Sequence, residues 1–437
     1  MPRVRSSRPI VAARRAGSRY RSLSRQRNAR LLLGSAFVSE IGDWFNIVAL
    51  LALAARFGDG ALSVGVMLAV RMAPRLLFQV PAGAIVDRFA SPRFLVVVQL
   101  AMGLVAASFA LIAAVPNLWL LYGLVFALET INTVAWPAFR VELGRSLTAD
   151  QRAPANGLLG LAMTVGQLIG PTIGWAILTV AAPTAVFLLN GLTFVGNAVA
   201  VSRIDRHRTI PFVPDNDAPQ THGGVGLAGA AGYRWLLRQP TLAAFTGVFL
   251  AANLMVQGTI ALFVSRATAL GLGQHGTGVF YTSVAVGTIV GSAAAGVGEY
   301  RHRGALYLVA GALAAMAVAL GVFGVAGGIP LALVALVAAG IGTDVGEVVG
   351  TTHFQHHLPE ALWGRFLSIL LVGVGMGGVI GVLSGPLLAK AVGISGALVL
   401  LAVPVVVLCG ILAAITRRAH PQADTDPMAF AADHTMT

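Results

Sequence analysis

The sequence predicts an all-α membrane protein built from twelve transmembrane helices in two six-helix bundles. Two features of the composition indicate this class, because 57% of the 437 residues are hydrophobic and only 11% are charged. A third observation is that the apolar residues gather in runs of roughly 20, the length at which a helix crosses a bilayer core of ~30 Å. The longest polar loop separates six such runs from six others and divides the chain into two halves.

The apolar runs define the predicted helices in chain order. They cover residues 31–55, 61–86, 94–115, 118–139, 155–180, 185–201, 242–264, 277–297, 305–325, 330–349, 366–389 and 397–416. An even number of crossings puts both termini on one side of the membrane. Loop arginines are concentrated on the side of the basic N-terminal tail, and the positive-inside rule identifies that side as the cytoplasm. We therefore expect a multi-pass protein of the plasma membrane with both termini cytoplasmic.

The predicted domains follow from these runs. They are a basic tail (1–30), an N-terminal bundle (31–201), a cytoplasmic linker (202–241), a C-terminal bundle (242–416) and a C-terminal tail (417–437). Within the linker, residues 227–239 form either a short amphipathic helix on the membrane surface or the beginning of the seventh membrane helix.

The charge and cysteine content narrow the choice of partners. Ten of the thirty basic residues precede Leu31, and with a net charge of +13 they indicate a tail near anionic lipid rather than a nucleic-acid partner. This tail is polar for too long to be a cleavable signal peptide. Cys409 is the single cysteine, so the chain forms no intrachain disulfide.

Ionisable side chains inside the apolar runs are the first candidates for function, since each costs ~2.5–3.5 kcal/mol on insertion scales. The set comprises Glu40, Asp43, Arg71, Arg75, Glu129, Asp344 and Glu347. These residues either carry coupling protons or neutralise one another in a packing network. Asp344 and Glu347 have no basic residue at membrane depth in their own half, so we expect at least one of them to be protonated at rest.

A short turn joins the first two predicted helices as antiparallel neighbours. Residues at equal depth then pair Asp43 with Arg71 and Glu40 with Arg75. Asp43 is the first candidate for the proton carrier of this half, and Glu129 is the second. We expect the arginine to hold the acid charged until a helix movement separates the pair.

Uncharged polar residues in the same runs are candidates for substrate contact or for joining helices. They are Asn132, Gln167, Asn253 and Gln257. His353, His356 and His357 lack an accompanying acidic ligand, so we interpret them as a polar interface rather than a metal site. The sequence has no phosphate-binding G-x-x-x-x-G-K-[ST] loop and no nucleophile–base pair. We therefore expect no cofactor, no enzymatic activity, and an ion gradient as the energy source.

The charged turn after the second predicted helix resembles a signature of the major facilitator superfamily. Gly83, Asp87 and Arg88 match the pattern G-x-x-x-D-R-x-G-R-R/K, whereas residues 90–92 depart from it, so only Arg93 is left to supply the downstream positive charge. The resemblance implies the major facilitator fold and a cytoplasmic gate. In that gate the aspartate meets the start of the eleventh helix near residues 364–366, where a helix N-terminus favours negative charge.

The fifth run resembles the antiporter motif of the same superfamily, G-x-x-x-G-P-x-x-G-G, and departs from it at Trp175. The matching residues are Gly166, Gly170, Pro171 and Gly174. The resemblance implies that this helix bends at the interface between the halves and limits leakage. The eleventh run repeats G-x-x-x-G-P at residues 381–386, where generic small-residue packing is the alternative.

Shorter matches resemble the exporter branch that includes macrolide-efflux proteins and the enterobactin exporter. They are G-D-W at 42–44, R-x-x-P at 71–74, W-P-A-F-R at 136–140, A-N-G at 155–157, L-P-E at 358–360 and G-R at 364–365. We therefore expect a monomeric, proton-coupled exporter of amphipathic small molecules, of the drug, macrolide or siderophore kind. The alternatives are an importer of a polar nutrient on the same fold and a membrane sensor or scaffold that transports nothing.

Overall fold

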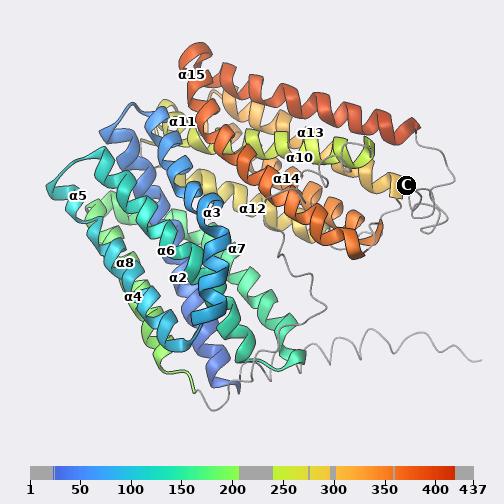
Figure 1. Ribbon diagram of the computed structural model, residues 1–437. Coiled ribbons are helices and arrows are strands. Elements are labelled where there is room, and N and C mark those ends of the chain that lie inside the picture. The colour runs from blue at the N-terminus through green and yellow to red at the C-terminus, as the bar shows by residue number, and fades with distance from the viewer. Residues whose placement is uncertain are drawn as a thin grey trace, which may run out of the picture. The chain divides into compact units, whose positions relative to one another are not determined.

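The structure is a computed structural model that describes residue 23 and residues 25–205, 240–273, 276–295, 302–357 and 360–418. Every regular element in these residues is a helix (Figure 1), which confirms the predicted all-α class. The helices are α2 (Arg27–Phe57), α3 (Ala61–Phe89), α4 (Pro92–Ser108), α5 (Leu111–Ala114), α6 (Leu118–Arg145), α7 (Ala149–Val180), α8 (Pro183–Ser202), α10 (Pro240–Ala261), α11 (Phe263–Ala269), α12 (Thr277–Ala295), α13 (His302–Val325), α14 (Ile329–His357) and α15 (Glu360–Arg418). The amphipathic segment predicted at 227–239 lies outside the described residues.

Within the described residues, ten helices are long and apolar enough to cross a membrane. The third predicted run corresponds to α4, a shorter apolar helix, followed by the single turn α5. The eleventh and twelfth runs both lie in α15, which Gly393 interrupts with φ 78° and ψ 166°, a conformation open to a residue without a Cβ. The multi-pass class is confirmed, and the count of twelve crossings stays a prediction.

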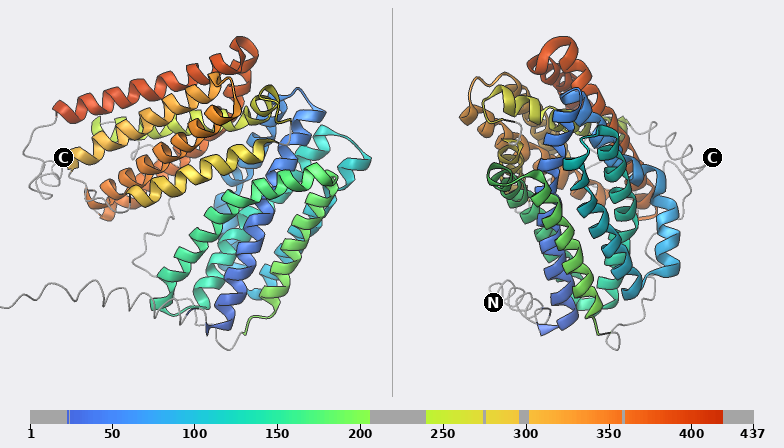
Figure 2. Two further views of the ribbon diagram at one scale, coloured as in Figure 1. Left: turned by 180° about the vertical axis from the view of Figure 1, so that it is seen from behind. Right: turned by 90° about the vertical axis from the view of Figure 1, so that its left-hand side faces the viewer.

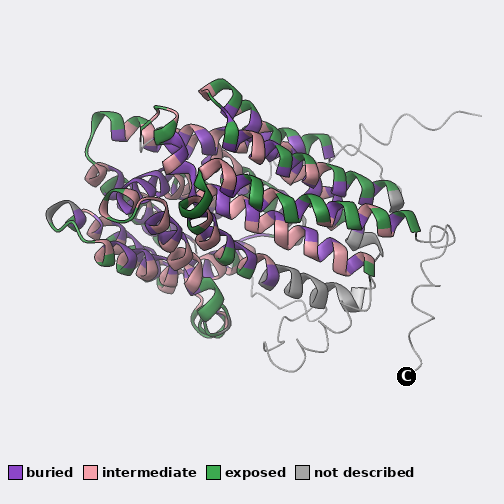
Figure 3. Ribbon diagram, turned by 90° about the horizontal axis from the view of Figure 1, so that it is seen from above, coloured by how far each residue is buried: buried purple, intermediate pink, exposed green. Residues whose placement is uncertain are grey.

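Exposed residues occur along the helices (Figure 3), and many of them are large apolar residues. Leu104, Leu192 and Val334, for example, are 72%, 63% and 65% exposed. Hydrocarbon is as apolar as these side chains, so such faces are stable against lipid where they would be costly in water. The surface therefore fits a protein that lies in a bilayer.

The chain divides into two compact units. Unit 1 comprises Met1–Leu50 and Ala73–Pro214, and unit 2 comprises Leu51–Met72 and Asp215–Thr437. The divisions fall inside α2 and α3, so the hairpin made by the end of α2 and the start of α3 belongs with the helices of the second half. The domain boundaries drawn from the sequence at the linker stay a prediction.

Glycines and a hydrophobic cluster position the helices of unit 1. The helices α4 and α8 lie side by side (Figures 1 and 2). They approach closely at Gly103 and Gly191, where a Cβ on Gly103 would lie only 3.2 Å from the carbonyl oxygen of Gly191. Where α2 begins, buried side chains from six helices and the residues next to their ends form what we call the end cluster. Its buried members are Leu23, Ala29, Leu32, Ala36, Val86, Leu95, Ala138, Phe139, Leu143, Leu147, Ala155, Leu159, Val201 and Ile204. The end cluster thus fixes one end of α2, α3, α4, α6, α7 and α8.

Unit 2 contains a buried aromatic group beside a buried arginine. The ring centroid of Phe280 lies 5.4 Å from that of Phe263 and 5.1 Å from that of Phe323, and the centroids of Phe263 and Phe323 are 5.8 Å apart. Arg266 Nε donates a hydrogen bond to the carbonyl of Phe323 at 3.1 Å, and its Nη2 donates to the carbonyl of Ala326. Burial lowers the pKa of Arg266, although an arginine remains charged at neutral pH. This cation therefore caps the negative end of α13.

Candidate functional site

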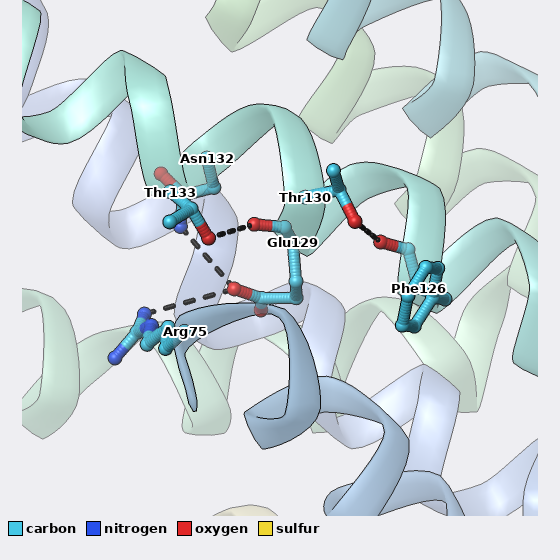
Figure 4. Close-up of polar contacts among 6 residues, drawn as sticks. All are labelled: Arg75, Phe126, Glu129, Thr130, Asn132 and Thr133. Atoms are coloured by element: carbon cyan, nitrogen blue, oxygen red, sulfur yellow. Dashed lines mark hydrogen bonds and ion pairs between the residues drawn. The ribbon is translucent and has the colours of Figure 1, made fainter. Parts of the chain in front are cut away.

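An ion pair joins α3 and α6 within unit 1 (Figure 4). Arg75 Nη2 lies 3.6 Å from Oε2 of Glu129, whose side chain is 7% exposed, whereas the Arg75 side chain is 62% exposed. Asn132 Nδ2 donates to the same oxygen at 3.3 Å, and Thr133 Oγ1 donates to the backbone carbonyl of Glu129 at 2.8 Å. The buried carboxylate thus has a cation and an amide donor, the partners that stabilise a charge away from water.

This contact differs from the pairing argued from the sequence, which assigned Arg75 to Glu40. The register argument applies to two helices joined by a short turn, whereas α3 and α6 are separated in sequence by α4 and α5. The opposite charges of Arg75 and Glu129, both at membrane depth, are the signal that could have suggested the pair. The pairs Asp43–Arg71 and Glu40–Arg75 stay predictions.

Three glycines of α7 face α2 within unit 1, and they are the glycines of the antiporter-like motif. A Cβ on Gly170 would lie 2.5 Å from the Cβ of Trp44, and one on Gly166 would lie 3.1 Å from the Cβ of Glu40. Gly174, one turn further along α7, makes a similarly close approach to Phe45, where a Cβ would lie 2.6 Å from the carbonyl oxygen. The motif therefore places α7 against the stretch of α2 that carries the acidic candidates. That it limits leakage stays a prediction.

In unit 2, Asp344 and Glu347 lie on α14 beside α12. Ser292 Oγ donates a hydrogen bond to Asp344 Oδ2. A Cβ on Gly291 would lie 3.0 Å from the Cβ of Asp344, and one on Gly340 would lie 2.4 Å from a carbonyl oxygen of α12. Asp344 is half-buried and Glu347 is exposed. The glycines thus bring a hydroxyl donor to the first acid, while proton transfer by either acid stays a prediction.

Two of the polar candidates lie where α10 packs on α15. Asn253 Nδ2 donates to the carbonyl of Val374 at 2.5 Å. A Cβ on Gly378 would lie 3.3 Å from Asn253 Nδ2, 3.6 Å from Gln257 Nε2 and 2.5 Å from Met72 Cε. The backbone bond favours helix joining as the role of Asn253. A substrate contact by Gln257 stays a prediction.

The remaining candidates are one glutamine and three histidines. Gln167 on α7 is half-buried, and His353 near the end of α14 is buried. The side chains of His356 and His357 lie outside the described residues. Among the side chains that the structure does describe, no group of three or more His, Cys, Asp or Glu is placed to hold a metal ion.

The charged turn between α3 and α4 has a defined local structure. Asp87, Arg88 and Arg93 are exposed, and Gly83 is half-buried one turn before the aspartate. Two of the residues that depart from the superfamily signature start α4. Ser91 Oγ accepts a hydrogen bond from the N–H of Phe94 at 3.2 Å, and Pro92 is the first residue of the helix. Both residues are favoured at helix starts. The side chains at 364–366, the predicted partners of Asp87, lie outside the described set.

Arg145, the last residue of α6, contacts this turn and was not among the residues singled out from the sequence. Its Nη1 donates to the carbonyl of Ala90 at 2.7 Å and lies 4.0 Å from Oε2 of Glu142, whose side chain is 2% exposed. Arg145 therefore ties the end of α3 to α6. In the sequence it counted only as one loop arginine, although an acid three residues earlier on the same helix was a usable signal.

Comparison with known proteins identifies relatives along most of the chain. The sequence profile described as Major Facilitator Superfamily matches residues 32–361. A protein of Bacillus subtilis (strain 168) named as a bacilysin exporter, BacE, is 25% identical over 390 residues, which cover 88% of this chain and 92% of the relative. YfiS from the same organism, an uncharacterized MFS-type transporter, is 23% identical over 218 residues, 50% of this chain and 51% of the relative.

Solved structures show the same fold. The nucleoside transporter NupG aligns with a TM-score of 0.67 at 12% identity, over 89% of this chain and 99% of that chain. A bacterial homologue of the human lysosomal transporter Spinster, in an inward-facing and unoccupied conformation, aligns with a TM-score of 0.69 at 14% identity, over 91% of this chain and 99% of that one. The turn signature, the antiporter-like glycines, the helical fold and the profile match agree, and the chain belongs to the Major Facilitator Superfamily.

Proposed function

We propose that the protein is a proton-coupled exporter of amphipathic small molecules that works as a monomer in the plasma membrane, with both termini cytoplasmic. The observation that carries the proposal is the buried Glu129 carboxylate, which is paired with Arg75 at membrane depth. The relative named as a bacilysin exporter supports the direction of transport and makes bacilysin the first substrate to test.

The Arg75–Glu129 pair provides a means of coupling. While the two groups are together, the guanidinium stabilises the ionised carboxylate. A movement of α3 that separates them removes this stabilisation of the charged form, and protonation of the buried carboxylate then becomes more favourable. Because Arg75 is exposed over more than half of its side chain, it is free to move without breaking a packed core. Alternating access supplies the movement.

The first prediction concerns Glu129→Gln, which keeps the shape and the amide contact but cannot take up a proton. In proteoliposomes under an imposed pH gradient, we expect substrate-driven proton flux to fall roughly tenfold or more, the change that 1.4 kcal/mol in a barrier produces. Exchange of substrate in the absence of a gradient should persist. Internal pyranine fluorescence measures the proton flux, and radiolabelled bacilysin measures the exchange.

The matched control is Asp59→Asn. Asp59 Oδ2 lies 3.2 Å from Lys390 Nζ, with both side chains exposed, and such pairs contribute only ~0–1 kcal/mol. This variant should couple as the wild type does. Retained proton flux in Glu129→Gln would reject Glu129 as the carrier and leave Asp43, Asp344 or Glu347. Accumulation in everted vesicles indicates export, accumulation in right-side-out vesicles indicates an importer, and accumulation in neither indicates a sensor or scaffold.

A further inference from the structure

The residues around the start of α2 are folded against one end of unit 1. We call residues 25–32 the clasp. Asn28, Ala29 and Leu32 are 2%, 0% and 0% exposed, and the two apolar residues belong to the end cluster. The clasp is therefore a packed part of the bundle rather than the free end of a tail.

Three side-chain hydrogen bonds hold the clasp in place. Gln26 Nε2 donates to the carbonyl of Ser146 at 2.9 Å, in the turn between α6 and α7. Asn28 Nδ2 donates to the carbonyl of Asp205 at 3.0 Å, and the N–H of Asp205 donates back to Asn28 Oδ1 at 3.0 Å. The reciprocal pair fixes the clasp beside the end of α8.

The opposite face of the clasp is basic. Arg25, Arg27 and Arg30 are exposed, and so is Arg203, two residues before the partner of Asn28. Within the described part of the chain, none of the four forms an ion pair. We call these four arginines the clasp patch.

We propose that the clasp patch binds the headgroups of anionic phospholipids. Arginine presents a planar fork of donors that suits a phosphate group. The apolar run of α2 begins at Leu31, directly after Arg30, so the patch lies at the level where hydrocarbon gives way to headgroups.

Exposed apolar side chains near the patch argue for a lipid rather than a free phosphate. Phe37 and Val38 on α2 are 38% and 51% exposed, within about two turns of the last clasp arginine. Val199 on α8 is 43% exposed, one turn before Arg203. A phospholipid seated at the patch thus has apolar side chains for its acyl chains and guanidinium groups for its headgroup. This proposal does not depend on the transported substrate.

The test is native mass spectrometry of the full-length protein in detergent, titrated with phosphatidylglycerol or phosphatidylcholine. The variant Arg25→Gln/Arg27→Gln/Arg30→Gln should lose affinity for phosphatidylglycerol by about fivefold per arginine, up to about 100-fold in total. Phosphatidylcholine binding should not change. The substituted side chains are exposed, so circular dichroism and the melting temperature should match the wild type.

Two further variants sharpen the test. Arg417→Gln/Arg418→Gln, at the end of α15, removes basic charge elsewhere and should leave phosphatidylglycerol binding unchanged. Asn28→Ala keeps every arginine but removes the reciprocal bonds to Asp205, so it should weaken phosphatidylglycerol binding without any change in charge.

Three results would overturn the proposal. The first is wild-type phosphatidylglycerol affinity in the triple arginine variant. The second is an equal loss in the Arg417/Arg418 variant, which would mean that net charge alone attracts the lipid. The third is displacement of the lipid by millimolar inorganic phosphate, which would show a general anion site.

Discussion

The buried guanidinium of Arg266 is a stabilising feature at the scale of single residues. It donates to two carbonyl groups at the end of α13, and removing it leaves buried acceptors without a donor. We expect Arg266→Met to lower the free energy of unfolding by ~1–3 kcal/mol, which a thermal melt in detergent would measure. Arg266→Lys should recover only part of this loss, because an ammonium lacks the fork that reaches both carbonyls.

The matched control for this prediction is Arg56→Met. Arg56 is exposed at the end of α2, and exposed substitutions usually change stability by less than ~0.5 kcal/mol. If both variants melt alike, the carbonyl contacts of Arg266 do not stabilise the fold.

The contacts of single charged residues could not be predicted from the sequence. From the sequence, Arg266 and Arg145 are charges outside the apolar runs, and Glu129 is an acid inside one. It could not show that Arg266 reaches carbonyls some 60 residues away, or that Arg145 reaches the carbonyl of Ala90. Such contacts depend on which helix ends meet, and no local pattern encodes that.

At the scale of helices, the glycine face of α7 determines how closely it approaches α2. In Gly170→Val even the Cβ would lie 2.5 Å from the Cβ of Trp44 and 3.0 Å from the carbonyl oxygen of Ile41. Forcing such overlap typically costs ~1–3 kcal/mol. We expect a lower melting temperature and weaker transport. Gly160→Val is the control, since a Cβ at that position of α7 meets nothing within 4 Å. Equal behaviour of the two variants would show that the close approach is unimportant.

The second half repeats this arrangement, with α15 against α10. A Cβ on Gly381 would lie 2.3 Å from the carbonyl oxygen of Leu254, and one on Gly385 would lie 2.5 Å from that of Gly258. We therefore expect Gly381→Val, like Gly170→Val, to lower the melting temperature. Gly410→Val, where a Cβ meets nothing within 4 Å, should not. A stable Gly381→Val protein would contradict this. The repeated G-x-x-x-G-P pattern predicted a close approach in both halves, but spacing alone does not name the neighbouring helix.

At the scale of the whole molecule, hydropathy predicted most helices but not where each of them ends. The runs matched the helices because an apolar stretch in lipid must satisfy its backbone internally. The third run was predicted to extend to residue 115, but the corresponding helix α4 ends at Ser108. The eleventh run was predicted to end at residue 389, but α15 continues until Gly393 interrupts it. The division into units inside α2 and α3 was not predictable, because composition marks loops and does not show which helices pack together.

The hairpin of Leu51–Met72 is covalently part of the first half of the chain but packs on α15 in unit 2. A Cβ on Gly65 would lie 2.2 Å from the carbonyl oxygen of Val382 and 3.0 Å from Cγ of Pro386. Two polypeptides, residues 1–214 and 215–437, should therefore reassemble without a covalent link when they are expressed together, because the hairpin carries its own docking surface.

An affinity tag on one polypeptide should then retain the other in mild detergent. Gly65→Val should reduce that recovery, whereas Gly34→Val, where a Cβ meets nothing within 4 Å, should not. Equal recovery from both variants would mean that the contact of Gly65 with α15 does not hold the two polypeptides together. If complementation succeeds, the linker is dispensable for assembly, and foreign domains inserted there would leave a working membrane protein.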